Sequence, residues 1–296
     1  MGQESMAAWM CRQKLVWWVA SLAAGIAAPR ALAQDVAGCA GTPASTPIAT
    51  PTAIVELYTS EGCSSCPPAD LWLSAVPRDG AVLALAFHVD YWDSPGWADR
   101  FADASHSARQ RQLQASDGAR FVYTPQILVN GRDFPSWRQS TPTELQRAIG
   151  PRSSGPVPAV AVRREGPQWV AEITPAPGAS ERQYAGYWAL LEDGHRSRVT
   201  AGENAGRALQ HDHVVRRYRP VGVWPAQQAQ QWRWPAPPEA EVGHAGRAVF
   251  VVTDASGGRP LTAGGRAWTT AAGCPPAETR TRPGVAASKS ERYSLR

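Results

Sequence analysis

Two cysteines three positions apart constrain this sequence more than any other feature. Cys63 and Cys66 follow a short apolar run, Ile54 to Tyr58, which predicts a strand, and they precede Pro67, which suits the first turn of a helix. The unpaired N–H groups at such a helix start stabilise a thiolate. The sequence therefore predicts a redox-active pair in which Cys63 attacks and Cys66 resolves the mixed disulfide.

Three simpler interpretations compete with redox chemistry at this pair: a static disulfide, half of a zinc site, and coincidence. Zinc needs two further ligands, and the sequence holds no second CxxC. His88 and His106 have a spacing that fits no standard zinc ribbon. We therefore expect no metal ligands and no cofactor, because the dithiol is itself the redox group.

The order of predicted elements around the cysteines indicates an α/β domain with a central sheet over residues 53–150. Strands and helices alternate there along the chain. The predicted strands are residues 54–58, residues 81–89 and a segment after Pro125 that ends at Asn130, and the predicted helices are residues 67–76, 98–116 and 142–149.

The composition changes after Gly150. Residues 151–156 read as a linker, and the following runs have the short apolar pattern of strands with little helical periodicity. We expect a second, β-rich domain over residues 156–274, with strands at residues 159–163, 169–174, 187–191, 213–218 and 248–253.

Both ends of the chain differ from the body. Residues 1–33 have a basic start, an apolar run and an A-x-A site, which predict a signal peptide; residues 34–52 read as a flexible leader and residues 275–296 as a disordered basic tail. The formal charge of +5 is concentrated in these ends. We therefore expect a periplasmic or secreted protein with no membrane span after signal cleavage and no nucleic-acid partner.

Two further cysteines, Cys39 and Cys274, flank the predicted domains. An even number of cysteines in an oxidising compartment suggests a second pair. The alternative, that both are unpaired in mobile ends, stays open.

Four segments resemble a known family when taken together: VELYTSEGCSSCPPAD, LAFHVDYWDSPGW, VYTPQILVNGRD and GENAGRALQHDHVVRRY. In this order they resemble the secreted bacterial thioredoxin-like proteins that are grouped as a domain of unknown function. The resemblance spans about residues 53–260. It implies a thioredoxin-like fold for the first domain, and it implies no activity.

The resemblance also gives Pro125 a role. Thioredoxin-like proteins carry a cis-proline opposite the CxxC, and Thr124-Pro125 fits that position. The backbone of Thr124 would then face a client chain. A trans proline that merely starts a strand is the alternative.

Four other residues are candidates for the site. Glu56, on the predicted central strand, is a candidate proton acceptor for Cys66, with an exposed strand end as the alternative. In strand alternation His88, Asp90 and Trp92 share one face, and we expect them to contact clients and to pack rather than to bind metal.

A second histidine pattern, His211-Asp212-His213, offers a weak metal motif in the β-rich region. An asparagine is common in the family where His213 stands, so we do not expect a required ligand there.

The function predicted from the sequence is an exported thioredoxin-like thiol–disulfide protein, a thiol–disulfide oxidoreductase if it is active. Its partners would be protein thiols or disulfides in the cell envelope. Two alternatives stay open: a Cu(I)-handling protein that uses the same cysteines, and a non-catalytic binding module for envelope proteins on a thioredoxin scaffold. Redox direction and client identity are not encoded in any pattern we recognise.

Overall fold

The structure is a computed structural model that describes residues 45–51, 53–78, 80–93, 96–118, 120–142, 144–145, 156–179, 182–236 and 244–269. The chain divides into two compact units, Met1–Cys39 and Ala40–Arg296, and all described residues belong to the second. The predicted signal peptide, most of the leader, residues 151–155 of the linker, the basic tail, Cys39 and Cys274 lie outside the described residues.

The elements predicted around the cysteines are present with small changes of boundary, except that the predicted helix at residues 142–149 lies largely outside the described residues. The 3-10 helix η1 and the late start of α2 are the main differences. The elements are β2 (Ala53–Thr59), α1 (Pro67–Ser74), β3 (Val82–His88), η1 (Asp90–Trp92), α2 (Ala104–Asp117), β4 (Gln126–Val129), β5 (Arg132–Asp133) and η2 (Pro135–Gln139).

The rest of the described chain is built from strands, as the patterns after residue 156 predict. Five of these strands, β1, β9, β10, β12 and β14, lie where no strand is expected from the sequence, and β1 falls in the predicted flexible leader. The strands are β1 (Ser45–Ile48), β6 (Ala159–Glu165), β7 (Gln168–Thr174), β8 (Gln183–Glu192), β9 (His195–Arg198), β10 (Ala208–His211), β11 (Val214–Pro225), β12 (Gln230–Pro235), β13 (Ala245–Asp254) and β14 (Pro260–Thr269).

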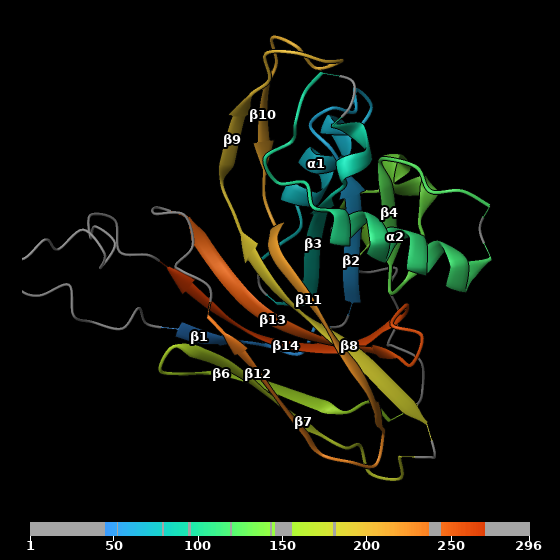
Figure 1. The fold of residues 1–296 in the computed structure, drawn as a ribbon, viewed down its shortest axis with the longest axis vertical. Coiled ribbons are helices and arrows are strands. Elements are labelled where there is room, and N and C mark those ends of the chain that lie inside the picture. Colours follow the sequence, from blue (N-terminus) through green and yellow to red (C-terminus); the bar gives the residue numbers. More distant parts are fainter. Residues whose placement is uncertain are drawn as a thin grey trace, which may run out of the picture. The chain divides into compact units, whose positions relative to one another are not determined.

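One mixed, curled sheet joins both halves of the chain (Figure 1). Its nine strands have the order β1-β14-β13-β8-β11-β3-β2-β4-β5. The junction is the parallel pairing of β11 with β3, where the N–H of Ala86 donates to the carbonyl of His213 at 2.8 Å. Strands from the end of the chain therefore extend the sheet that begins at the cysteines.

This topology corrects the predicted fold class. The chain is mostly β, with only two α-helices in the described residues, and it is not an α/β thioredoxin-like fold followed by a β-rich domain. The prediction was wrong because the alternating elements of residues 53–150 look self-sufficient in sequence, whereas β3 still has a free edge that β11 pairs with. The division of the chain near residue 150 stays a prediction.

Helix α2 covers one face of the sheet and begins and ends at recognisable signals. The side chain of Asp103 accepts from the N–H of Ser105, and Gly118 ends the helix with a φ of 69°. On the sheet face beneath it, apolar residues of β2, β3, β8 and β13 form one buried cluster that includes Tyr58, Phe87 and Tyr187. Alternation along β2 and β3 sends the neighbouring residues to the opposite face, which α1 covers.

A second, three-stranded sheet, β12-β7-β6, packs on the nine-stranded sheet. Trp169 and Ile173 of this smaller sheet share a buried cluster with Trp188 and Phe250 of the larger one. The two sheets approach closely at Gly264 of β14, because a Cβ there would overlap the carbonyl oxygen of Val160 in β6. Glycine is required at position 264 because the contact leaves no room for a side chain.

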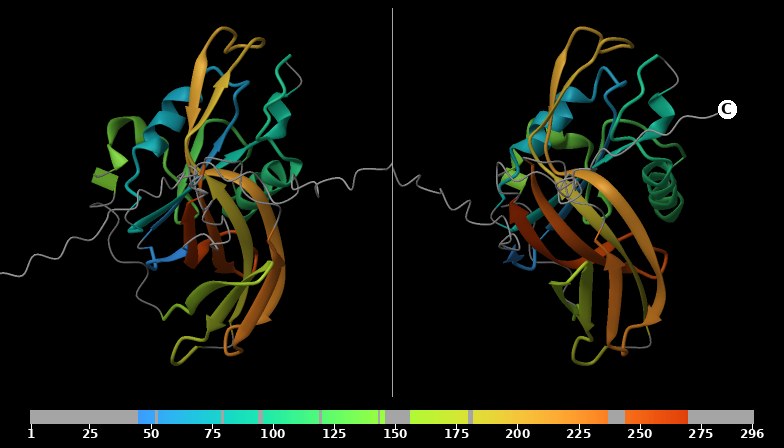
Figure 2. Two further views of the ribbon diagram at one scale, coloured as in Figure 1. Left: turned by 90° about the vertical axis from the view of Figure 1, so that its left-hand side faces the viewer. Right: turned by 60° about the vertical axis from the view of Figure 1, so that its left-hand side comes forward.

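The β9–β10 hairpin leaves the sheet at the ends of β8 and β11 and reaches the α1 side of the molecule (Figures 1 and 2). Its two strands pair only with each other among the described elements. The hairpin therefore brings residues near position 204 to the loop that carries the cysteines, more than a hundred residues earlier in the chain.

Candidate functional site

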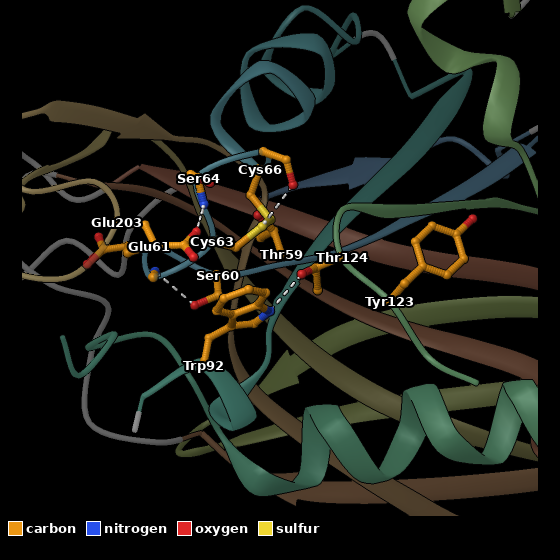
Figure 3. The surroundings of a disulfide bond; sticks show 12 residues. Thr59, Ser60, Glu61, Cys63, Ser64, Cys66, Trp92, Tyr123, Thr124 and Glu203 are labelled. Atoms are coloured by element: carbon orange, nitrogen blue, oxygen red, sulfur yellow. Dashed lines mark hydrogen bonds between the residues drawn. A yellow bond between two sulfur atoms is a disulfide. The ribbon is translucent and has the colours of Figure 1, made fainter. Parts of the chain in front are cut away.

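Cys63 and Cys66 form a disulfide between the end of β2 and the start of α1, as the sequence pattern predicts (Figure 3). Cys66 is the N-cap of α1, and its carbonyl accepts from the N–H groups of Ala69 and Asp70. Pro67 stands in the first turn, where a missing N–H costs nothing. The pair therefore lies at the positive end of a helix.

Both sulfur-bearing residues are covered. Cys63 is 1% exposed and Cys66 is fully buried, whereas Ser64 and Ser65 between them are exposed. An attacking thiol can reach a sulfur atom only if the loop around the disulfide moves. This burial is a feature that the sequence pattern does not reveal.

The loop between β9 and β10 holds the cysteine loop in place. The side-chain amide of Asn204, which is fully buried, donates to the carbonyls of Glu61 and Cys63, each at 2.9 Å. The carboxylate of Glu203 accepts from the N–H of Ser64 at 3.0 Å. Sequence reasoning missed both residues, although the segment GENAGRALQHDH was one of those that carried the family resemblance.

Thr124 and Trp92 lie together beside the disulfide (Figure 3). The indole N–H of Trp92 donates to Oγ1 of Thr124 at 2.7 Å. The Thr124–Pro125 bond is cis, as expected. A Cβ at Gly62 would stand 3.0 Å from the carbonyl oxygen of Trp92, so the cysteine loop passes close against this residue.

His88, Asp90 and Trp92 do not share a strand face. β3 ends at His88, and the next residues turn into the 3-10 helix η1, which breaks the alternation. The side chain of Asp90 instead binds Ser107 in the first turns of α2. The predicted grouping is therefore wrong in geometry, and the client-contact roles stay predictions.

His88 is buried on the α1 side of the sheet and bound to Asp99. Its Nδ1 lies 2.6 Å from Oδ2 of Asp99, which also accepts from the N–H of Glu61 at 2.9 Å. Burial alone would raise the pKa of Asp99, but the His88 imidazole and the N–H groups of Glu61 and Phe101 lower this pKa to about 2. Asp99 is thus an anion at neutral pH.

A second buried histidine meets His88 from the hairpin. The ring centroids of His88 and His211 are 5.0 Å apart. Nε2 of His211 lies 3.2 Å from Oε1 of Glu61, and its Nδ1 lies 4.0 Å from Oδ2 of Asp70. The other oxygen of Glu61 accepts from the indole N–H of Trp97 at 2.7 Å.

The carboxyl groups in this cluster differ in their proton affinity. Burial raises the pKa of Asp70 to about 7, although His211 and the hydroxyl of Thr59 act against the rise. Burial also acts to raise the pKa of Glu61, but the His211 imidazole beside it reverses the effect and lowers this pKa. The buried face next to α1 thus holds several ionisable groups.

Glu56 points to the opposite face of β2. Its Oε1 accepts from Nη2 of Arg109 at 2.6 Å and from the hydroxyl of Tyr187 at 2.8 Å. The guanidinium of Arg109 also stacks over the Tyr187 ring, 4.2 Å from its centroid. This side chain belongs to an ion pair under α2 rather than to the group next to α1, and its role as a proton acceptor stays a prediction.

The pattern His211-Asp212-His213 is split by the structure. His213 has a φ of 58° and its Nδ1 lies 2.8 Å from Nη2 of Arg247, on a different side from His211. Burial, with Arg247 and Arg78 nearby, lowers the pKa of His213 well below its usual value. Of the two histidines, only His211 lies next to His88. The sequence does not reveal this, because a turn follows His211 and the alternation of a strand does not continue through it.

The described helices include none long and apolar enough to cross a membrane. The fold and site define a class of protein: a mostly-β chain with a buried disulfide at the start of a helix. The chain belongs to the family described as protein of unknown function, DUF1223, whose family model matches residues 54–252.

The chain is similar to a protein of known crystal structure, AGR_C_4864 from Agrobacterium tumefaciens. The two are 28% identical with a TM-score of 0.55, over 74% of this chain and 94% of that one. A weaker likeness, with a TM-score of 0.49 and 11% identity, is to HBP35 of Porphyromonas gingivalis over 83% of this chain and 82% of that one. No curated protein matches the chain.

Proposed function

We propose that this chain exchanges its Cys63–Cys66 disulfide with thiols of other proteins in the cell envelope. The observation that supports this most is the disulfide at the N-terminus of α1, with Cys66 as the N-cap. A helix start stabilises the thiolate that is released when the bond opens, and this stabilisation makes a disulfide reactive. The signal-peptide pattern and the persistence of disulfides in oxidising compartments support the cell envelope as the location.

The exchange proceeds in two successive thiolate attacks. A client thiolate attacks Sγ of Cys63, the Cys63–Cys66 bond breaks, and Cys66 leaves as a thiolate that takes up a proton. A second client thiolate then attacks the mixed disulfide, so the client becomes oxidised by two electrons and both cysteines become reduced. The reverse sequence reduces a client disulfide, with Cys63 as the nucleophile and Cys66 as the resolving thiol.

Opening of the covering loop is part of this proposal. Because Cys63 is 1% exposed, the contacts of Asn204 and Glu203 must loosen before a client reaches the sulfur. A disulfide that is shielded until a client displaces the loop would be protected from small thiols. This gives the hairpin a direct part in the exchange.

Trapping tests the proposal. In Cys66→Ser the mixed disulfide with Cys63 cannot be resolved, so covalent adducts should accumulate in the cell envelope and disappear on reduction of the gel sample. The matched control, Cys63→Ser, lacks the attacking thiol and should form far fewer. Equal adducts from both variants, or none from Cys66→Ser, would contradict the proposed roles.

A further inference from the structure

Beside α1 lies a buried cluster of ligand-type side chains that the disulfide chemistry does not use. Asp70 of α1, His88 of β3 and His211 of β10 each offer one ligand atom, and these atoms all lie within 4.8 Å of one another. The three side chains are nearly fully buried, with residue exposures of 6%, 0% and 1%. Three elements from distant parts of the sequence converge on this point.

Several polar atoms of the cluster have no hydrogen-bond partner. Among the described residues, Nε2 of His88 and Nδ1 of His211 are buried without one, while Nε2 of His211 and Oε1 of Glu61 face each other at 3.2 Å without the alignment of a hydrogen bond. Buried polar atoms in native proteins are nearly always satisfied, and each exception needs an explanation. A group bound among Asp70, His88 and His211 would explain Nε2 of His88 and Nδ1 of His211 together.

The neighbours of His88 prepare it as a ligand. With an N–H on Nδ1 directed at Asp99, 2.6 Å away, Nε2 is the ring nitrogen that can offer a lone pair to a ligand. An imidazole that donates its other N–H to a carboxylate is the usual arrangement around a metal-bound histidine. The N–H groups of Glu61 and Phe101, each 2.9 Å from an oxygen of Asp99, hold this carboxylate in place for the supporting role.

His211 has the same arrangement. Its Nε2 lies 3.2 Å from Glu61, so a proton there faces a carboxylate, and the lone pair on Nδ1 faces Asp70 at 4.0 Å. Thr59 donates its hydroxyl to Oδ2 of Asp70 and fixes this carboxylate from the β2 side. Each of the three ligand-type residues is therefore oriented by a partner of its own.

We propose that Asp70, His88 and His211 form a divalent transition-metal site, best suited to Zn²⁺. Two imidazoles and a carboxylate are a donor set that Zn²⁺ accepts, with bonds of about 2.0–2.2 Å and a fourth position for water. Shifts of under about 1 Å per side chain would bring the three atoms to those bond lengths. Phe101 covers the cluster, with its ring 5.1 Å from that of His88 and 5.5 Å from that of His211.

This site departs from the expectation of no metal ligands. His88 was expected to pack and contact clients, and His211 belonged to a weak motif. Nothing in the spacing of residues 70, 88 and 211 reveals that they meet, because the hairpin that carries His211 joins the sheet through β11.

Metal binding to the purified, untagged chain tests the proposal, with Co²⁺ as a visible probe for Zn²⁺. After treatment with chelator and its removal, the chain should bind about one Co²⁺, with a visible absorption spectrum that Zn²⁺ abolishes by displacement. His88→Gln and His211→Gln should each weaken the binding at least about tenfold, and Asp99→Asn, which removes the orienting carboxylate, about ten- to a hundredfold.

Two controls make the result specific. His213→Gln, two residues from His211 but directed at Arg247, should bind Co²⁺ as the unchanged chain does. The double variant Cys63→Ser/Cys66→Ser should also bind it unchanged, which separates this site from metal held by thiolates and from the fate of the exchange proposal.

Metal uptake by the unchanged chain can contradict the proposal by itself, so the test does not depend on the folding of any variant. If the chelator-treated protein takes up no Co²⁺ or Zn²⁺, the cluster holds only water and the proposal is wrong. Binding that survives in His88→Gln and His211→Gln, with circular dichroism showing both to be folded, would equally overturn it.

Discussion

Glu56 illustrates that the sequence does not reveal the partners of a single buried charge. A carboxylate on a central strand suggests chemistry, and here it is bound by Arg109 and Tyr187 beneath α2. The alternation of side chains on β2 places Glu56 on this face, since Leu57 and Glu56 point to opposite faces. That Glu56 is buried could be predicted; the partner from α2 could not, because it lies 53 positions away.

We expect Glu56→Gln to destabilise the protein without changing the exchange reaction. Loss of the carboxylate leaves the Arg109 guanidinium buried without a counter-charge, which costs about 3–5 kcal/mol in the free energy of unfolding. Urea unfolding measures this loss. Glu165→Gln, in an exposed pair with Arg233, is the control and should leave stability unchanged.

The same variant separates the two roles of Glu56. If Glu56 were the proton acceptor for Cys66, mixed disulfides would resolve more slowly in the folded Glu56→Gln protein. An unchanged rate of resolution together with lower stability is the expected outcome.

Asn204 is the residue most directly placed to control access to the disulfide. We expect Asn204→Ala to speed reduction of the Cys63–Cys66 bond by dithiothreitol by about tenfold or more. The variant loses two hydrogen bonds to the cysteine loop, each worth about 0.5–1.5 kcal/mol. A quenched assay with thiol alkylation measures the rate at which dithiothreitol reduces the disulfide.

The control for this variant is Gln231→Ala, an exposed amide that binds Glu172 in the smaller sheet. It should be reduced at the rate of the unchanged chain. Equal rates for Asn204→Ala and the unchanged chain would show that the hairpin does not limit access.

Among the elements, those with strong local signals were predicted well. The strand, turn and proline-started helix around the cysteines are found at β2 and α1, and the hairpin of β6 and β7 is found where two apolar runs flank Pro167. The missed strands β9, β10 and β12 are short or polar, so their local pattern is weak and pairing with neighbours determines them.

The contact between the two sheets gives a test at this scale. We expect Gly264→Ala to lower the free energy of unfolding by about 1–3 kcal/mol, because the added Cβ overlaps the carbonyl of Val160 and pushes the sheets apart. In Gly222→Ala, in β11, the added Cβ meets no atom of the described residues within 4 Å, so stability should change by less than about 0.5 kcal/mol. Thermal or urea unfolding compares the two, and equal losses would mean that the sheets do not pack tightly at Gly264.

At the scale of the whole molecule, the sequence could not reveal that one sheet spans both halves. The order of predicted elements fits a complete α/β domain, yet β11 adds to the edge of β3 in parallel and brings β8, β13 and β14 with it. Long-range pairing of this kind depends on which edge is left open, and no local pattern records it. The candidate site has the same origin, since its two histidines and Asn204 meet only because β10 and β11 are placed by this sheet.

The reduction potential of the Cys63–Cys66 couple is the measurement that tests the central claim most directly. The full chain is equilibrated with glutathione buffers of known ratio, and the fraction of reduced protein is counted by thiol alkylation. A pair that serves exchange, with its thiolate stabilised at the start of α1, should have a potential above about −300 mV. Structural disulfides have potentials below about −300 mV, so a value in that range would contradict the exchange function and indicate a bond that only stabilises the cysteine loop.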